Sequence, residues 1–220
     1  MTSAGVKARR PTIVARSEPP KRSSMVIAVV EAGTPMSSSS PDRLTCMSDH
    51  EPIETINLDR YGSDPLPWSR AHDQLAIGAQ GPGRVYFLGT TRPDGRPHAA
   101  GVGVVWFDGD LYFTSSPGRR KAHNLAANPA ATMSVRLDGL DLIFEGEARR
   151  VTAPDTLERV VAIFREGGWP ATVEGDAFTA PYSAPSAGPP PWHLYRFTFV
   201  AAQAVATAEP YGATRWRFEP

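Results

Sequence analysis

The chain has very little of three things that would narrow its function at once: cysteine, long apolar runs and net charge. The lone Cys46 excludes an intramolecular disulfide framework and any zinc or iron–sulfur site built on several cysteines. No apolar run approaches the roughly 18–20 residues of a membrane-spanning helix, and the stretch 25–30 is too short for a secretory signal. These absences favour a cytoplasmic protein in a reducing compartment.

Charge is balanced overall but not along the chain. Residues 1–46 carry seven Lys and Arg against three Asp and Glu, which leaves 16 and 20 in residues 47–220. Nucleic-acid binding rests on clustered Lys and Arg that release phosphate counterions, and this mildly acidic body offers no extended basic stripe. We therefore expect a small-molecule partner, with neither nucleic acid nor membrane.

Common catalytic signatures are also missing. The sequence has no Gly-x-Ser-x-Gly elbow, no His-Glu-x-x-His zinc helix and no Walker loop, and Gly81-Pro82-Gly83 lacks the third glycine of a dinucleotide fingerprint. The histidines are scattered along the chain and suggest no metal cluster. The sequence therefore contains none of the motifs that usually identify a hydrolase or a nucleotide triphosphatase.

The chain divides into an unstructured start and a folded remainder. Residues 1–46 are rich in Ser, Pro, Arg and Ala, and we expect a disordered extension there. Its composition is similar to an organelle transit peptide, but we favour Met47 as the true start of translation. Residues 47–74 are interpreted as a lead-in segment and residues 75–220 as the folded domain.

The folded part shows short β-type segments separated by turns. Asp94-Gly95 and Asp108-Gly109 are hairpin signals. β-branched and aromatic residues predict strands at 84–91, 98–107, 111–115, 131–136, 142–152, 193–206 and 213–218. Helices are predicted at 117–127, with Ser116 as N-cap, and at 154–166. The Pro-rich stretch 167–192 is expected to be irregular, so the fold class is mainly β with a few helices.

Hydroxyl groups and cations cluster where one predicted strand ends and the next predicted helix begins. The residues of this junction are Thr114, Ser115 and Ser116 at the end of a predicted strand, followed by Arg119, Arg120 and Lys121 at the start of a predicted helix. Free N–H groups and the helix dipole favour a phosphate at this position, whereas the dipole opposes each cation by roughly 0.3–1 kcal/mol. Three cations together therefore indicate a bound anion; the alternative is a solvated basic turn.

Three motifs give this junction a context. They are Gly-Thr-Thr-Arg-Pro-Asp-Gly-Arg-Pro-His at 89–98, Trp-Phe-Asp-Gly-Asp-Leu-Tyr-Phe-Thr at 106–114 and Arg-Arg-Lys-Ala-His-Asn-Leu-Ala-Ala-Asn-Pro at 119–129. From about residue 75 to 218 the chain resembles the pyridoxamine 5'-phosphate oxidase-like, FMN-binding split β-barrel superfamily. Within it, the chain is most similar to the F420-dependent flavin/deazaflavin oxidoreductase branch. The resemblance implies a six-stranded antiparallel split β-barrel and a homodimer with the cofactor at the subunit interface.

The same resemblance implies the cofactor-binding residues. Thr114, Arg119, Lys121 and Asn124 match the positions that hold the cofactor phosphate, with Ser115 and Ser116 beside them, while Arg120 has no counterpart in the family pattern. Ala100, Gly101 and Val102 match the strand that runs beside the tricyclic ring, where short side chains let a flat ring approach the backbone.

No side chain is assigned as catalytic, because in this family the cofactor carries the hydride chemistry. His98 is the candidate for proton transfer, and the alternative is a solvated histidine at the start of a strand. Trp106, Tyr112 and Phe113 are assigned to the barrel core, as is Trp68. The aromatic residues of the 167–192 stretch either cap the open face of the ring or pack over the barrel; they are Trp169, Phe178, Tyr182 and Trp192.

The implied function is hydride transfer between F420 and a small organic substrate, which the 167–192 stretch would select. An FMN-dependent oxidase or reductase of the same fold is the alternative enzyme. Against pyridoxamine-phosphate oxidase itself, Arg215 and Arg217 are too few to form a second basic cluster for a substrate phosphate. A non-catalytic flavin or haem carrier is the alternative from another functional class.

Overall fold

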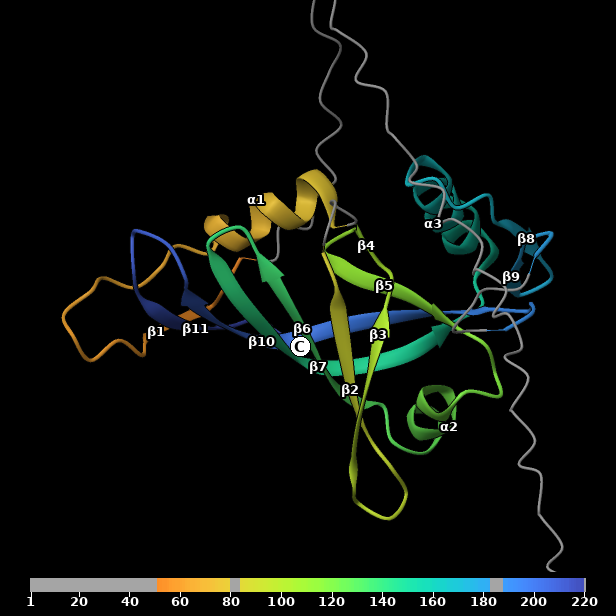
Figure 1. The fold of residues 1–220 in the computed structure, drawn as a ribbon, viewed down its shortest axis with the longest axis horizontal. Coiled ribbons are helices and arrows are strands. Elements are labelled where there is room, and N and C mark those ends of the chain that lie inside the picture. The colour runs from red at the N-terminus through yellow and green to blue at the C-terminus, as the bar shows by residue number, and fades with distance from the viewer. Residues whose placement is uncertain (1–50, 80–83, 183–187, 220) are drawn as a thin grey trace, which may run out of the picture. The chain divides into compact units, whose positions relative to one another are not determined.

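The computed structural model describes residues 51–79, 84–182 and 188–219 (Figure 1). The extension expected at residues 1–46 lies outside the described residues. Within them, no helix is long and apolar enough to cross a membrane.

Three helices and eleven strands make up the described part of the chain. The helices are α1 (Ser69–Gly78), α2 (Arg120–Ala127) and α3 (Pro154–Glu166). The strands are β1 (Glu54–Asn57), β2 (Tyr86–Thr91), β3 (Pro97–Val102), β4 (Val104–Phe107), β5 (Asp110–Ser115), β6 (Ala130–Leu137), β7 (Leu140–Val151), β8 (Thr172–Glu174), β9 (Ala177–Thr179), β10 (His193–Ala206) and β11 (Ala213–Arg217).

Nine strands join in one antiparallel sheet, and β8 and β9 form a separate hairpin. The sheet runs in the order β1-β11-β10-β7-β6-β2-β3, and a branch adds β5 to β10 and β4 to β5. One edge of the 14-residue β10 pairs with β7, while the other pairs with β5 and, further along, with β11. This arrangement confirms the mainly β, antiparallel split-barrel class, although the sheet of the described residues contains nine strands rather than the expected six.

Two hydrophobic cores form around the strands. The larger one fills the barrel, and the smaller one joins α3 to the β8–β9 hairpin (Figure 1). Because side chains alternate along a strand, β5 sends Phe113 into the larger core and Tyr112 into the smaller one. Trp68 lies in the larger core, with its ring centroid 4.9 Å from that of Phe218 and 5.3 Å from that of Trp216. The assignment to the barrel core is confirmed for Phe113 and Trp68, whereas Tyr112 lies in the smaller core.

Several segments differ from the sequence-based prediction, which placed no helix or strand before residue 84 and so missed β1 and α1. The strand expected at 98–107 is two strands separated by Gly103, because β3 pairs with β2 whereas β4 pairs with β5. The stretch 167–192 is not wholly irregular: β8 and β9 are joined by a turn in which Gly175 has a φ of +61°. Strands of three residues are too short to give a periodic signal in a sequence.

Residues 51–78 are attached to the sheet through β1 and α1. β1 pairs with β11, and α1 is fixed by the guanidinium group of Arg70. This group donates hydrogen bonds to the carbonyl oxygens of Gly139 (3.0 Å), Ala208 (2.9 Å) and Pro210. Arg70 therefore joins α1 to the β6–β7 turn and to the connection between β10 and β11.

A close approach of two backbones shapes the centre of the sheet. The register between β7 and β10 shifts between Phe199 and Ala201, which is a β-bulge. At Gly146, opposite this bulge, a Cβ atom would lie 2.1 Å from the carbonyl oxygen of Thr198 and 2.7 Å from Cα of Phe199. Only glycine fits here without moving one of the strands.

We expect Gly146→Ala to lower the free energy of unfolding by roughly 1–3 kcal/mol or more, because the methyl group would collide with backbone atoms. Gly78→Ala is the matched control. It lies at the end of α1, where a Cβ atom would meet nothing within 4 Å, and alanine there should be neutral or stabilising by up to about 1 kcal/mol. Chemical denaturation measures both variants. Equal stability of the two would contradict the close approach.

Candidate functional site

The chain turns at Ser116 before α2 begins. The N–H of Arg119 donates to the carbonyl oxygen of Ser116 (3.1 Å), which closes a turn over Pro117 and Gly118. Arg119 has an extended backbone and is the N-cap of α2, and no side chain caps the helix. The prediction of Ser116 as N-cap, with the helix starting at 117, is therefore wrong.

The later start places all three cations on the N-terminal turn of α2. Arg119 is the N-cap, and Arg120 and Lys121 are the first two helical residues, where backbone N–H groups lack intrahelical partners. Arg119 and Arg120 are exposed and Lys121 is partly buried. Burial, and to a lesser degree the charge of Arg119, lower the pKa of Lys121. No acidic residue lies in this first turn.

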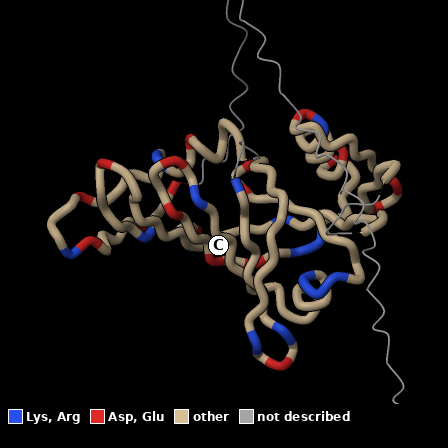
Figure 2. The backbone as a smooth tube through the Cα atoms, viewed as in Figure 1, with Lys and Arg blue, Asp and Glu red and all other residues tan. Residues whose placement is uncertain are grey.

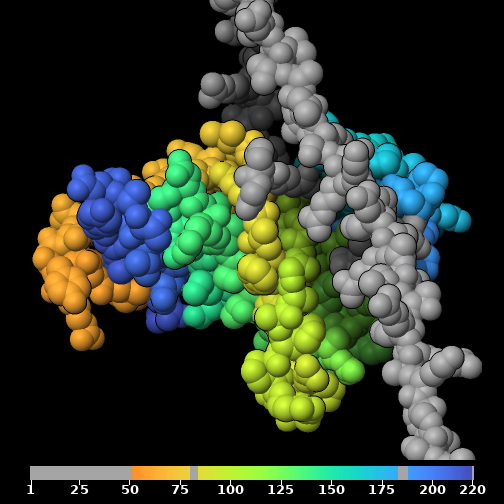
Figure 3. Space-filling model, viewed as in Figure 1, coloured from red at the N-terminus to blue at the C-terminus, as the bar shows by residue number. Residues whose placement is uncertain are grey.

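The charges of nearby cations, including two of α2, act on the side chain of His98. Burial is the largest cause that lowers its pKa, followed by the charges of Arg92, Lys121 and Arg120. Since Arg92 follows β2 and His98 belongs to β3, the β2–β3 hairpin and α2 contribute to one basic cluster, which we define as Arg92, His98, Arg119, Arg120 and Lys121. Basic residues gather on both elements in Figure 2, and the hairpin projects from the sheet in Figure 3.

Within the described residues, Arg92, Arg120 and Lys121 form no ion pair with a carboxylate. The Nε atom of Arg92 is buried and has no hydrogen-bond acceptor among them. Cations that repel one another and lack a carboxylate favour binding of an anion.

A buried hydrogen bond holds α2 against the hairpin. Nδ2 of Asn124, which is fully buried, donates to Oγ1 of Thr90 (2.9 Å). Thr90 lies opposite His98 in the β2–β3 register, and Oγ1 of Thr90 is 3.4 Å from Nδ1 of His98. Oδ1 of Asn124 is buried without a partner among the described residues. Asn124 thus lies behind the basic cluster and fixes the position of α2.

The hydroxyl residues before α2 point in different directions. Ser115 is fully buried, and its hydroxyl donates to the carbonyl oxygen of Ser116 (3.2 Å). Thr114 is partly buried on the opposite face of β5, where it pairs with Leu194 of β10. Of the three, Ser116 lies nearest to the basic cluster, because it immediately precedes the turn that leads to Arg119.

The segment expected beside the ring lies on an outer strand. In the described sheet, β3 pairs with β2 and has no second partner, so one edge of its backbone is unpaired. Ala100 and Val102 are partly buried, Gly101 is exposed, and a Cβ atom at Gly101 would meet nothing within 4 Å. A groove of about 730 Å³ begins at Pro97, His98 and Ala99 and crosses β2 and β6 to reach Gly146 of β7.

The aromatic residues of the 167–192 stretch pack over the barrel instead of lining this groove. Phe178 and Trp192 are buried in the smaller core, and the Trp169 ring lies 5.1 Å from that of Phe164 in α3. Trp106 is partly buried against the larger core. Within the described residues, no three His, Cys, Asp or Glu side chains lie close enough to hold a metal ion.

Sequence reasoning missed Thr90 and Arg92. A usable signal was present, because the predicted Asp94-Gly95 hairpin places Thr90 opposite His98 and Arg92 at the end of the same strand.

Comparison with known proteins places the chain in a family. Residues 83–206, more than half of the chain, match the family described as pyridoxamine 5'-phosphate oxidase. No curated protein matches the chain.

Three solved structures illustrate the likeness. An F420 reductase is 26% identical, with a TM-score of 0.39, over 54% of this chain and 87% of that one. A conserved hypothetical protein from Mycobacterium tuberculosis is 19% identical, with a TM-score of 0.50, over 68% and 90%. A pyridoxamine 5'-phosphate oxidase-related, FMN-binding protein from Nostoc punctiforme is 17% identical, with a TM-score of 0.45, over 70% and 98%. The likeness to the Mycobacterium protein supports the fold alone.

The matched region contains both the β2–β3 hairpin and α2, and the chain therefore belongs to the pyridoxamine 5'-phosphate oxidase family.

Proposed function

We propose that this protein is an oxidoreductase that binds a phosphate-bearing deazaflavin or flavin and transfers hydride between that cofactor and a small organic substrate. Coenzyme F420 is the first choice and FMN the alternative. The observation that carries the proposal is the basic cluster of Arg92, His98, Arg119, Arg120 and Lys121 beside the outer strand β3.

The basic cluster fits a phosphate group. Lys121 and Arg120 at the start of α2 lie beside backbone N–H groups that are free to donate. The Nε–H of Arg92 also lacks an acceptor within the described residues. A phosphate dianion would supply acceptors for these donors. It would also offset the mutual repulsion of the cations, which after burial is the second cause that lowers the pKa values of His98 and Lys121.

The outer strand β3 fits the flat ring system of such a cofactor. Its unpaired edge offers backbone N–H and C=O groups, and the open space at Gly101 admits a planar group close to the main chain. A bound F420 or FMN would supply the hydride chemistry, and Ala100, Gly101 and Val102 would orient its ring. His98 belongs to the basic cluster and also lines the groove, and burial, followed by the charges of Arg92, Lys121 and Arg120, lowers its pKa. It would act as a hydrogen-bond partner.

We also propose a homodimer. Val85, Phe87 and Ile143 are exposed on the outer face of the sheet and line a groove of about 430 Å³. Phe87 lies opposite Gly101 in the β2–β3 register, so this apolar face continues to the segment proposed for the ring. A second copy of the chain that covered Phe87 would also exclude water from the ring.

Titration of the purified protein with F420 and, separately, with FMN tests the choice of cofactor. We expect binding of both through their phosphates and tighter binding of F420, followed by absorbance or fluorescence of the cofactor. Tighter binding of FMN would select the alternative enzyme. Tight binding without turnover of reduced cofactor, over a panel of unsaturated and oxidised substrates, would select a carrier instead.

Lys121→Ala should weaken cofactor binding by roughly 1.5–3 kcal/mol, which is about 10- to 150-fold in Kd, because it removes a charge-assisted hydrogen bond. The same variant should raise the pKa of His98 in the cofactor-free protein, since Lys121 is one of the charges that lower it. Titration of the His98 ring by NMR measures this pKa. Arg217→Ala, which removes an exposed ion pair with Glu54 outside both grooves, is the control and should change neither quantity. If Lys121→Ala binds cofactor like the parent protein, the basic turn is only solvated.

Phe87→Lys tests the proposed dimer. Size-exclusion chromatography with light scattering should give a dimer for the parent protein and a monomer for the variant, because a lysine would have to be buried without a partner. Cofactor affinity should fall together with dimerisation. A monomeric parent protein would contradict the proposal.

A further inference from the structure

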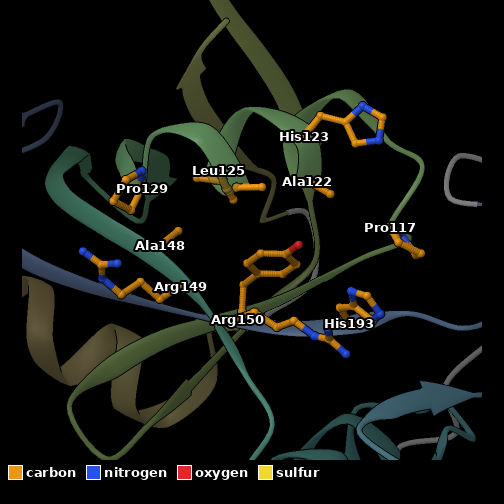
Figure 4. Close-up of a pocket in the computed structure, with 11 residues that line it drawn as sticks. Pro117, Ala122, His123, Leu125, Pro129, Ala148, Arg149, Arg150 and His193 are labelled. Atoms are coloured by element: carbon orange, nitrogen blue, oxygen red, sulfur yellow. The ribbon is translucent and has the colours of Figure 1, made fainter. Parts of the chain in front are cut away.

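A second cavity lies on the other side of α2 from the basic cluster. It has a volume of about 340 Å³ and lies between α2 and the paired strands β7 and β10. Ala122 and Leu125 of α2 form one apolar wall, and Ala148 of β7 faces them (Figure 4). All three residues are buried. An apolar body of modest size fits between these walls.

Polar groups gather at one end of the cavity. The side chains of Arg150 and His193 lie beside each other below Pro117 in Figure 4, and Tyr195 lies opposite Arg150 in the β7–β10 register. Burial, followed by the charge of Arg150, lowers the pKa of His193, whereas the charge of Asp176 raises it. Burial raises the pKa of Tyr195, and the charge of Arg150 lowers it. Arg150 and Asp176 therefore act in opposite directions at this end of the cavity.

The described lining of the cavity contains two arginine side chains, those of Arg149 and Arg150, and no carboxylate. Nη2 of Arg150 binds the carboxylate of Asp176 (2.7 Å), but a guanidinium group has five N–H donors and can hold a second acceptor. The side chain of Arg149 points away from this end in Figure 4 and binds Glu147.

The cavity is separate from the proposed cofactor site. Asn124 turns toward Thr90 of β2, whereas Ala122 and Leu125 line the cavity. The basic cluster and the cavity therefore use different faces of α2, and a ligand in one does not need the other.

We propose that this cavity is a second binding site, for a small planar carboxylic acid whose carboxylate binds Arg150 and His193 and whose apolar body packs between Ala122, Leu125 and Ala148. A few polar groups that converge at one end of an otherwise apolar cavity are the usual form of a small-molecule site. The carboxylate of the ligand and that of Asp176 would both accept hydrogen bonds from Arg150, so the two would compete for its donors.

Binding of sodium benzoate to the full chain tests this proposal by calorimetry and by NMR of the His193 ring. We expect saturable binding with a shift of the His193 signals. Arg150→Gln should weaken binding by about tenfold or more, the scale of a lost charge-assisted hydrogen bond. Arg217→Gln, which removes an exposed ion pair with Glu54 outside the cavity lining, is the control and should leave the affinity within about twofold.

Two further variants separate this proposal from a folding defect and from the cofactor site. Asp176→Asn removes the competing carboxylate and should tighten benzoate binding, an outcome that misfolding does not produce. Lys121→Ala should weaken the cofactor and leave benzoate unaffected. Equal binding of benzoate and neutral benzamide, unchanged affinity in Arg150→Gln, or displacement of benzoate by F420 or FMN would each overturn the proposal.

Discussion

The fold depends on the close contact between β7 and β10 at Gly146. The carbonyl oxygen of Thr198 comes so near to Cα of Gly146 that no side chain fits between the strands. The bulge at this point bends β10, and the same edge of β10 that pairs with β5 before the bulge pairs with β11 after it. One strand can thus belong to both halves of the split barrel, and the two halves share one hydrophobic core.

The pairing of β10 with its neighbours also determines where the candidate site lies. β5 is held against the first half of β10, and the chain leaves β5 at Ser115 and turns directly into α2. The hydrogen bond from Asn124 to Thr90 then joins α2 to β2, which brings the cations of α2 beside the β2–β3 hairpin. Within the described residues, Arg92, Arg120 and Lys121 gather without an ion-paired carboxylate. This costs free energy in the absence of a ligand, and a bound anion would recover it. Sites that disfavour the empty state in this way are typical of function rather than of stability.

Much of this could be predicted from the sequence, for identifiable reasons. The Asp94-Gly95 and Asp108-Gly109 turns specify hairpins, and α3 was located by Leu157, Val160, Val161 and Phe164, all of which are buried. Local patterns did not reveal where a strand changes partner, so the break at Gly103 and the double use of β10 were missed. The start of α2 was misplaced because Ser116 and Pro117 resemble a helix start but close a turn instead. Nor does residue type tell whether a polar side chain faces a ligand or the interior, as the burial of Ser115 and Asn124 shows.

The division into two cores bears on how such a protein can change over evolutionary time. The smaller core, built by α3 and the β8–β9 hairpin, shares no buried side chain with the barrel core. The smaller core also contains Val105, Tyr112 and Leu194 of the barrel strands. Substitutions confined to α3 and the β8–β9 hairpin, however, leave the buried side chains of the barrel core unchanged. The region from α3 to the β8–β9 hairpin is where we expect relatives to diverge most in sequence.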